Sequence, residues 1–287
     1  MKTIRTLAAV GMLALGVTSL TGCDALNGTS EGFGECELTG QPGSIQLQPQ
    51  TPDTLTVTTV LPSNGWWNGD SPEAVNSGFE YCMVANIAHR AGLKSLTIQN
   101  QSWDQYISAS KQDYDISLAS TTITDERKEV FDFSEPYFQS NLGIAVKDGA
   151  DVTAENIAEK RVGVLQGNMG AQFVTDTLKP AGGPQLFQSE TEMFTALKAG
   201  QIDAVITDTT LALTNTSASN GELKVIAQYQ VDQGYGITLP KGSTNVDGVN
   251  KAIEEMKSDG TFDKLSASYL QPLFGVDPNT IPTWEQP

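Results

Sequence analysis

The sequence predicts an α/β protein made of two similar halves that face a shared cleft. Hydrophobic residues make up 39% of the 287 residues and aromatic residues 7%, which is enough to build a core and excludes a wholly disordered chain. Strand-like runs alternate with helix-like runs along most of the chain. This alternation is typical of βαβ units, in which a mostly parallel sheet is covered by helices on both faces.

Each strand and helix is predicted from its own residues. Residues 55–61 are rich in β-branched side chains and end before a proline, which predicts a strand. Residues 79–91 place apolar side chains at helical spacing and end at a glycine, which predicts a helix. Residues 189–192, Ser-Glu-Thr-Glu, form a capping box before a helix over 193–199, so Glu190 is assigned to this box. The same criteria predict strands over 96–98, 115–120, 162–165 and 203–207, and helices over 103–111, 169–178, 246–257 and 262–270.

One segment has a counterpart in the second half of the chain. Residues 111–120 and 198–208 both leave a helix, pass through a turn and open a buried strand with an aspartate. Five residues after each aspartate comes a polar residue, Ser120 or Asp208. In a parallel sheet these residues lie at the carboxyl ends of strands, where α/β proteins bind ligands. The alternative is a chance similarity between two βαβ units.

The charge of the chain excludes several classes of function. The net charge is −17, with 17 Lys and Arg against 34 Asp and Glu. Such a surface repels phosphate backbones and anionic lipid headgroups, so we expect no nucleic-acid partner. An anionic ligand would need a specific local cation. The one histidine, His89, leaves too little for a histidine-rich metal site or a Ser-His-Asp triad, and we expect no metal or cofactor.

The N-terminus has the features of an export signal. A short basic start is followed by apolar and small residues over 7–20, a run too short for a typical spanning helix. Residues 20–23, Leu-Thr-Gly-Cys, resemble the lipobox of bacterial lipoproteins. The resemblance implies cleavage after a signal peptide of residues 1–22 and acylation of Cys23, which would anchor the chain on the outer face of the cytoplasmic membrane. The alternative is an ordinary signal peptide followed by a chance cysteine.

The next segment is expected to link this anchor to the globular body. Residues 23–50 are rich in Gly, Ser, Thr, Gln and Pro, which predicts a flexible tether. Two cysteines remain, Cys36 and Cys82. Disulfides persist outside the cytoplasm, so the two can pair; the alternative is a pair of free, buried thiols.

A longer motif points to a known family. Residues 120–127 read Ser-Thr-Thr-Ile-Thr-Asp-Glu-Arg, and residues 131–137 read Phe-Asp-Phe-Ser-Glu-Pro-Tyr. Together they closely resemble the signature of bacterial extracellular solute-binding proteins of family 3, which bind amino acids for ABC importers. The resemblance extends over about residues 54–272. Further matching motifs follow the family order at residues 78–80, 160–167, 200–204 and 234–237.

The resemblance implies the type II periplasmic-binding-protein fold, with two lobes and mostly parallel sheets joined by two crossover strands. The crossovers are expected near 139–143 and 228–234. Lobe 1 would then be discontinuous, comprising residues 51–139 and 235–287. Lobe 2 would comprise residues 142–231.

The resemblance also implies roles for individual residues. Arg127 matches the arginine that grips the ligand α-carboxylate, a task suited to a guanidinium fork. Without the motif, the favoured interpretation of Arg127 is a surface ion pair with Asp125 or Glu126. Ser120 and Thr122 match positions that contact the α-ammonium and the carboxylate. Asp208 matches the lobe 2 carboxylate that pairs with the α-ammonium, and it can also cap a helix.

The expected specificity rests on the pocket walls. Asn168 and Met169 match a loop whose N–H groups meet the carboxylate at a helix start. Trp103 matches an aromatic residue that stacks on the ligand side chain, and Trp67, or its neighbour Trp66, is expected to cover the other face unless it belongs to the core. No carboxylate stands near Val60, where members selective for basic side chains often carry Asp. We therefore expect an uncharged amino acid as ligand.

The implied function is capture without catalysis. The lobes would close on an amino acid, and a monomeric closed form would deliver it to an ABC permease. A sensory lipoprotein that reports to a receptor would have the same binding site. A second alternative is an enzyme on this scaffold, similar to cyclohexadienyl dehydratase. Such an enzyme would need a general acid, for which Glu126 and Glu135 are available.

Overall fold

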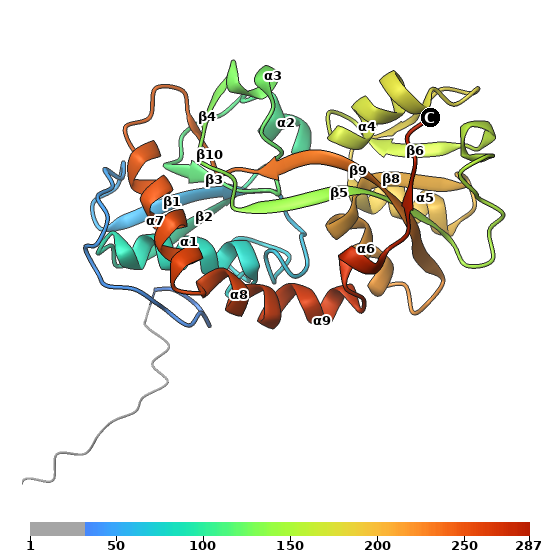
Figure 1. Ribbon diagram of the computed structural model, residues 1–287. Helices are drawn as coiled ribbons and strands as arrows, with labels where there is room; N and C mark the ends of the chain where they lie inside the picture. The colour runs from blue at the N-terminus through green and yellow to red at the C-terminus, as the bar shows by residue number, and fades with distance from the viewer. Residues whose placement is uncertain (1–31) are drawn as a thin grey trace, which may run out of the picture.

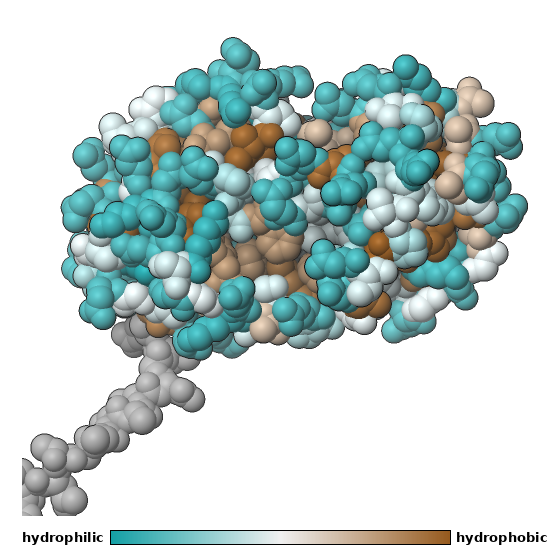
Figure 2. Space-filling model, in the orientation of Figure 1, coloured by the Kyte–Doolittle hydropathy of each residue, from teal (hydrophilic) through white to brown (hydrophobic). Residues whose placement is uncertain are grey.

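The computed structural model describes residues 32–287. The expected signal peptide and Cys23 therefore lie outside the described residues. The chain forms two α/β lobes, each built around one sheet, with two long strands running between them (Figure 1). Hydrophilic side chains cover most of the face shown in Figure 2, and hydrophobic residues show at the waist between the lobes. Along residues 32–287, no helix is long and apolar enough to cross a membrane.

Lobe 1 contains a five-stranded sheet with the order β2-β1-β3-β10-β4. Strand β1 pairs in parallel with both neighbours, β2 and β3, whereas β10 returns from the C-terminal half of the chain and pairs antiparallel with β3 and β4. The strands are β1 (Thr54–Thr59), β2 (Ser95–Asn100), β3 (Ile116–Ser117), β4 (Phe131–Phe133) and β10 (Thr238–Pro240).

Lobe 2 contains a six-stranded sheet with the order β11-β9-β5-β8-β6-β7. Its strands are β5 (Phe138–Lys147), β6 (Val162–Leu165), β7 (Gln185–Phe187), β8 (Ala204–Asp208), β9 (Leu223–Tyr235) and β11 (Thr283–Trp284). β5 runs antiparallel to both β8 and β9. Both sheets combine parallel and antiparallel pairings: β10 makes the antiparallel ones in lobe 1, and the crossover strand β5 makes them in lobe 2.

The two crossovers are β5 and β9. They pair antiparallel from Phe138 and Tyr235 at the lobe 1 end to Lys147 and Leu223 at the far end of lobe 2. The register shifts between Ser140 and Leu142, close to the point where the strands leave lobe 1. Segments around both predicted crossover positions lie within these two strands.

Helices flank both sheets. In lobe 1 they are α1 (Phe79–Arg90), α2 (Trp103–Ile107), α3 (Asp125–Lys128), α7 (Val246–Ser258), α8 (Thr261–Leu265) and α9 (Gln271–Phe274). In lobe 2 they are α4 (Met169–Phe173), α5 (Glu190–Lys198) and α6 (Thr209–Ser217). A π turn, Val174–Leu178, continues α4, and another, Ser266–Leu270, joins α8 to α9. Short 3-10 turns lie at Ile157–Glu159 and Pro278–Thr280. The expected helix over 103–111 and strand over 115–120 are both shorter than predicted.

The segment expected to be a flexible tether packs against lobe 1 over its described part. Phe33, Cys36 and Ile45 are each less than 5% exposed and belong to the lobe 1 core. Cys36 forms a disulfide with Cys82 of α1, so the two thiols are paired and not free. The polar composition of the segment did not reveal these three widely spaced buried side chains.

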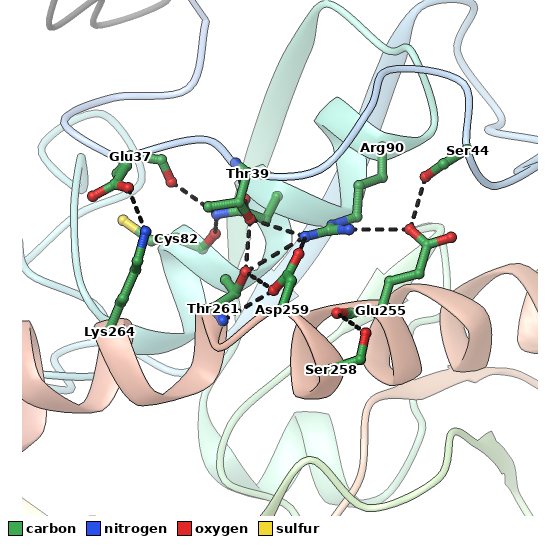
Figure 3. A network of polar contacts seen from close by, with 11 residues as sticks. Glu37, Thr39, Ser44, Cys82, Arg90, Glu255, Ser258, Asp259, Thr261 and Lys264 are labelled. Carbon is green, nitrogen blue, oxygen red and sulfur yellow. Dashed lines mark hydrogen bonds and ion pairs between the residues drawn. The ribbon is translucent and has the colours of Figure 1, made fainter.

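A buried arginine holds this segment to the C-terminal helices (Figure 3). Arg90, at the end of α1, donates to Glu255 at 3.0 Å and to Asp259 at 2.6 Å. Its guanidinium also donates to the hydroxyl of Thr39 at 2.9 Å. Ser44 donates to the same Glu255 carboxylate. Two stretches some 200 residues apart in sequence are thereby connected through one cation.

The C-terminus also departs from the expected lobe boundaries. Helix α9 contacts α6 of lobe 2, and β11 pairs in parallel with β9 in the lobe 2 sheet. The end of the chain therefore crosses from lobe 1 to lobe 2 (Figure 1). Residues 235–287 do not all belong to lobe 1 because the edge of β9 is open to pairing and β11 occupies it.

The disulfide should contribute strongly to stability. It joins residues 46 positions apart, and closing a loop of that length lowers the entropy of the unfolded chain by an amount worth roughly 4 kcal/mol. We expect the double variant Cys36→Ala, Cys82→Ala to lose about that much free energy of unfolding in a urea titration. Reductant should destabilise the natural protein and leave the variant unchanged. A loss below about 1 kcal/mol would show that the segment is held by its packing alone.

Candidate functional site

A small cavity lies between the two lobes. Its volume is about 190 Å³, below the ~300 Å³ at which pockets for drug-sized ligands begin. Lobe 1 contributes residues from the turn after β1, from α2 and from the segment before α3, and lobe 2 contributes the ends of β6 and β8 and the start of α5. A larger groove of about 810 Å³ lies beside the crossover strands and α9, and Asp277 is its one charged lining residue. Of these two hollows, the small cavity therefore has more charged side chains in its wall.

Arg127 reaches the cavity from lobe 1. It belongs to α3, which begins where the hydroxyl of Thr124 accepts a hydrogen bond from the Arg127 N–H. Its guanidinium is buried and donates to the Thr122 carbonyl at 2.7 Å and to the Gly167 carbonyl at 2.9 Å. Burial lowers the pKa of Arg127 from its usual value, but an arginine remains protonated in proteins. Lobe 1 thus supplies a fixed cation.

Asp208 reaches the cavity from lobe 2, at the carboxyl end of β8. It is 4% exposed, and its carboxylate accepts hydrogen bonds from Gln233 at 3.0 Å and from the hydroxyl of Tyr235 at 2.8 Å. Burial raises the pKa of Asp208, against which these two donors and the charge of Arg127 act. Lobe 2 thus supplies a carboxylate held by two residues of crossover β9.

These two charges face the same cavity without forming an ion pair. Among the described residues, Arg127 and Asp208 make no salt bridge with each other or with any other charged side chain. Unpaired buried charges are costly. An occupant with a negative group at one end and a positive group at the other would neutralise both.

The segment that carries Ser120 and Thr122 is shaped by a buried carboxylate. Ser120 has a backbone φ of 49°, which is unusual for a residue other than glycine. Its N–H donates to Glu80 of α1 at 2.8 Å, and Glu80 also accepts from Trp67 at 2.6 Å and from Tyr137. Burial raises the pKa of Glu80. Glu80 thus holds the strained turn that carries Ser120 and Thr122, both of which line the cavity.

The lobe 2 loop places two more predicted residues in the cavity wall. The side chain of Asn168 caps α4 by accepting from the Ala171 N–H at 2.9 Å and donates to Thr207 at 3.0 Å. Met169, the first residue of α4, also lines the cavity. The buried Asn168 side chain is thus occupied in shaping the loop.

Trp103 lines the cavity and also touches the other lobe. Its indole N–H donates to the Gln166 carbonyl at 2.8 Å, and the Arg127 guanidinium lies 5.7 Å from its ring centre. The bond to Gln166 and that from Arg127 to Gly167 both join lobe 1 donors to the lobe 2 loop. The structure therefore has the two lobes in contact across the cleft.

The predicted role of Trp67 is wrong. Trp67 is fully buried in the lobe 1 core, does not line the cavity and donates its indole N–H to Glu80. Trp66 is equally buried and packs edge-to-face against Phe79 and Phe138. Both tryptophans belong to the core because the polypeptide turns inward after Pro62.

The structure adds one charged residue that the sequence analysis assigned only to a capping box. Glu190, the first residue of α5, lines the cavity, and Asn215 donates to its carboxylate at 3.0 Å. Burial raises the pKa of Glu190 to about 7. Glu190 comes shortly after β7, which pairs in parallel with β6. Because ligands bind at the carboxyl ends of parallel strands, this position was the signal that could have identified Glu190 as a cavity residue.

The comparisons with known proteins agree with this architecture. Residues 69–272 match the model of the bacterial extracellular solute-binding proteins, family 3. The chain belongs to this family. This solute-binding protein is 32% identical over 162 residues to the ABC transporter glutamine-binding protein GlnH of Bacillus subtilis (strain 168), a match that covers 55% of this chain and 59% of that protein. It is 30% identical over 206 residues to the L-cystine-binding protein TcyJ of Escherichia coli (strain K12), covering 70% of this chain and 75% of the relative.

Solved structures of solute-binding proteins have the same fold. An ancestral arginine-binding protein bound to arginine superimposes with a TM-score of 0.68 and 34% identity, covering 76% of this chain and 98% of that one. The arginine-, lysine-, histidine-binding protein ArtJ from Geobacillus stearothermophilus gives 0.66 and 26%, covering 78% and 96%. An ancestral amino acid-binding protein described as a precursor of cyclohexadienyl dehydratase gives 0.66 and 27%, covering 76% and 95%. These likenesses confirm the predicted type II periplasmic-binding-protein fold.

Glu190 should make stability depend on pH. Its pKa of about 7 in the folded protein exceeds the ~4.3 of an exposed glutamate, so the folded state holds a proton that the unfolded state releases between these values. Stability should therefore fall as pH rises from about 5 to about 8. In Glu190→Gln this pH-dependent loss of stability should be absent. The variant should therefore melt at a higher temperature than the natural protein at pH 8 but not at pH 5.

The control for this measurement is Glu192→Gln, two residues further along α5, whose side chain is exposed. Its melting temperature should differ from that of the natural protein by the same amount at both pH values. Equal behaviour of the two variants would contradict the raised pKa of Glu190.

Proposed function

We propose that this protein captures a single amino acid between its lobes and delivers it to an ABC importer permease. The carrying observation is the pair of buried, mutually unpaired charges, Arg127 in lobe 1 and Asp208 in lobe 2, that face one small cavity. An amino acid is a zwitterion, so its α-carboxylate suits the Arg127 fork and its α-ammonium suits Asp208. The relatives described as glutamine- and cystine-binding proteins support an amino acid as the ligand class.

The remaining predicted residues complete this binding arrangement. Ser120 and Thr122 border the Arg127 side of the cavity, Asn168 and Met169 form the wall from lobe 2, and Trp103 supplies an aromatic face. Neither lobe alone can neutralise both ends of the ligand. The ligand therefore stabilises the closed arrangement over an open one, and the closed form is the state that a permease would recognise.

Binding is a better account of this cavity than catalysis. Glu126 and Glu135, the general acids considered for an enzyme, do not line it. The charged side chains that do line it are Arg127, Asp208 and Glu190, and the first two match the ends of the ligand. A sensory protein would use the same binding site, so the cavity does not distinguish sensing from transport. Delivery to a permease is therefore part of what we propose.

The expectation of an uncharged ligand rested on the missing carboxylate near Val60. Glu190 lines the same cavity as Val60, so a carboxylate is available from the other lobe. The side-chain class of the ligand therefore has to be argued from Glu190 itself.

We further infer that Cys23 carries a lipid anchor and that the monomeric protein works on the outer face of the cytoplasmic membrane. The basic start, the short apolar run and the Leu-Thr-Gly-Cys motif stand in the order that a lipoprotein signal requires. Several acyl chains on one residue give stable membrane attachment. Such an anchor keeps the captured amino acid close to the permease.

Arg127→Ala should weaken amino-acid binding by at least about 30-fold, because removing one partner of a buried charge pair costs roughly 2–5 kcal/mol. The measurement is calorimetric titration with the amino acid that gives the largest thermal shift among the twenty. Lys128→Ala is the matched control, because Lys128 is the next residue and its exposed side chain pairs with Asp125. Unchanged affinity in a folded Arg127→Ala protein would disprove the site.

Cys23→Ser should release the protein from the membrane, because the hydroxyl cannot take the thioether-linked acyl chains. After expression in a bacterium that processes lipoproteins, the natural protein should be found in the membrane fraction. The variant should be found in the soluble extracytoplasmic fraction. Equal membrane retention would show that the anchor lies elsewhere.

A further inference from the structure

Glu190 and Arg127 lie on different flanks of the cavity. Glu190 also lines an adjoining hollow with Pro62, Ser63 and Asn64, whereas Arg127 also borders the outer surface beside Gly167. Asp208 lines the cavity but neither of these two neighbouring hollows. Arg127 and Glu190 therefore lie toward opposite flanks of the cavity, with Asp208 in the wall that they share.

The carboxylate of Glu190 has spare binding capacity. Asn215 donates to one oxygen, Oε2, and no other hydrogen bond to this carboxylate comes from the described residues. No Lys, Arg or His nitrogen of residues 32–287 lies within 4.0 Å of it. Asn215 is itself fixed by donating to the Leu211 carbonyl at 2.9 Å. Glu190 is thus a positioned carboxylate that faces a cavity without a cation beside it.

The charge balance of the cavity indicates what is missing. The charged residues that line it are one arginine and two carboxylates, which gives a net charge of −1 when all are ionised. A neutral amino acid would satisfy Arg127 and Asp208 but would leave Glu190 either protonated, with its charge unused, or ionised without a cation beside it, which is costly. An amino acid with a positive side chain would neutralise all three.

We propose that the natural ligand is an amino acid whose side chain ends in a guanidinium or an ammonium group, which pairs with Glu190 on the far side of the cavity from Arg127. This inference rests on the amino-acid capture proposed above. The methylene groups of such a side chain would lie between Leu61, Leu165 and Leu211, which line the same cavity. Specificity is then set by lobe 2, where Glu190 and Asp208 project from neighbouring elements.

The test compares L-arginine with L-citrulline, which has the same shape but a neutral urea in place of the guanidinium. Calorimetric titration of the purified protein should show arginine binding at least about 30-fold more tightly, the lower end expected for a buried charge pair. L-lysine and L-norleucine form a second pair, for the ammonium. In Glu190→Gln the preference for arginine over citrulline should fall to within about threefold. Glu192→Gln, with the same charge change on the same helix, should retain the full preference.

The outcomes separate this inference from the function on which it rests. If the natural protein binds citrulline or another neutral amino acid as tightly as arginine, the cationic side chain is wrong and amino-acid capture stands. A preference for arginine that survives in Glu190→Gln would also overturn the role of Glu190, provided that citrulline binding shows the variant to be folded. If no amino acid binds, both proposals fail.

Discussion

The structure depends on keeping one cation and one carboxylate buried on opposite sides of a small cavity without letting them pair. Arg127 donates to two neutral carbonyls, and Asp208 accepts from two neutral donors. Each charge is therefore held in place but not neutralised. In the proposed function, a molecule with both signs of charge would bridge the two groups and recover the electrostatic cost of this arrangement, so the site would select a zwitterion whatever its side chain.

One residue, Tyr235, connects this charge pair to the crossover strands. Tyr235 ends crossover β9, its backbone pairs with Thr122 beside Arg127, and its hydroxyl donates to Asp208. The preceding crossover, β5, pairs with β8 so that Leu142 lies opposite Asp208. The strands that join the lobes therefore also carry Gln233 and Tyr235, the two donors that hold Asp208. A change in the angle between the lobes necessarily changes the distance between the two charges.

The sequence predicted most of the residues that line the cavity. Arg127 and Asp208 line it, as do Ser120, Thr122, Asn168, Met169 and Trp103, because they belong to short local motifs whose spacing along the chain is retained in the fold. Trp67 and Glu190 were misplaced because residue type does not reveal on which side of a turn a side chain points: Trp67 faces the core, and Glu190, which looked like part of a helix cap, faces the cavity. The segment around Phe33 was taken for a tether because composition averages over the few side chains that pack.

The C-terminal segment also helps to position Asp208. Gln228 of β9 donates to the carbonyls of Pro278 and Ile281 and accepts from Thr209, the residue that follows Asp208. The strand β11 then pairs with β9 at this point. These contacts lie beside the crossover strands, where the two lobes join. The C-terminal segment therefore helps to fix Thr209 at the start of α6, and with it the neighbouring Asp208.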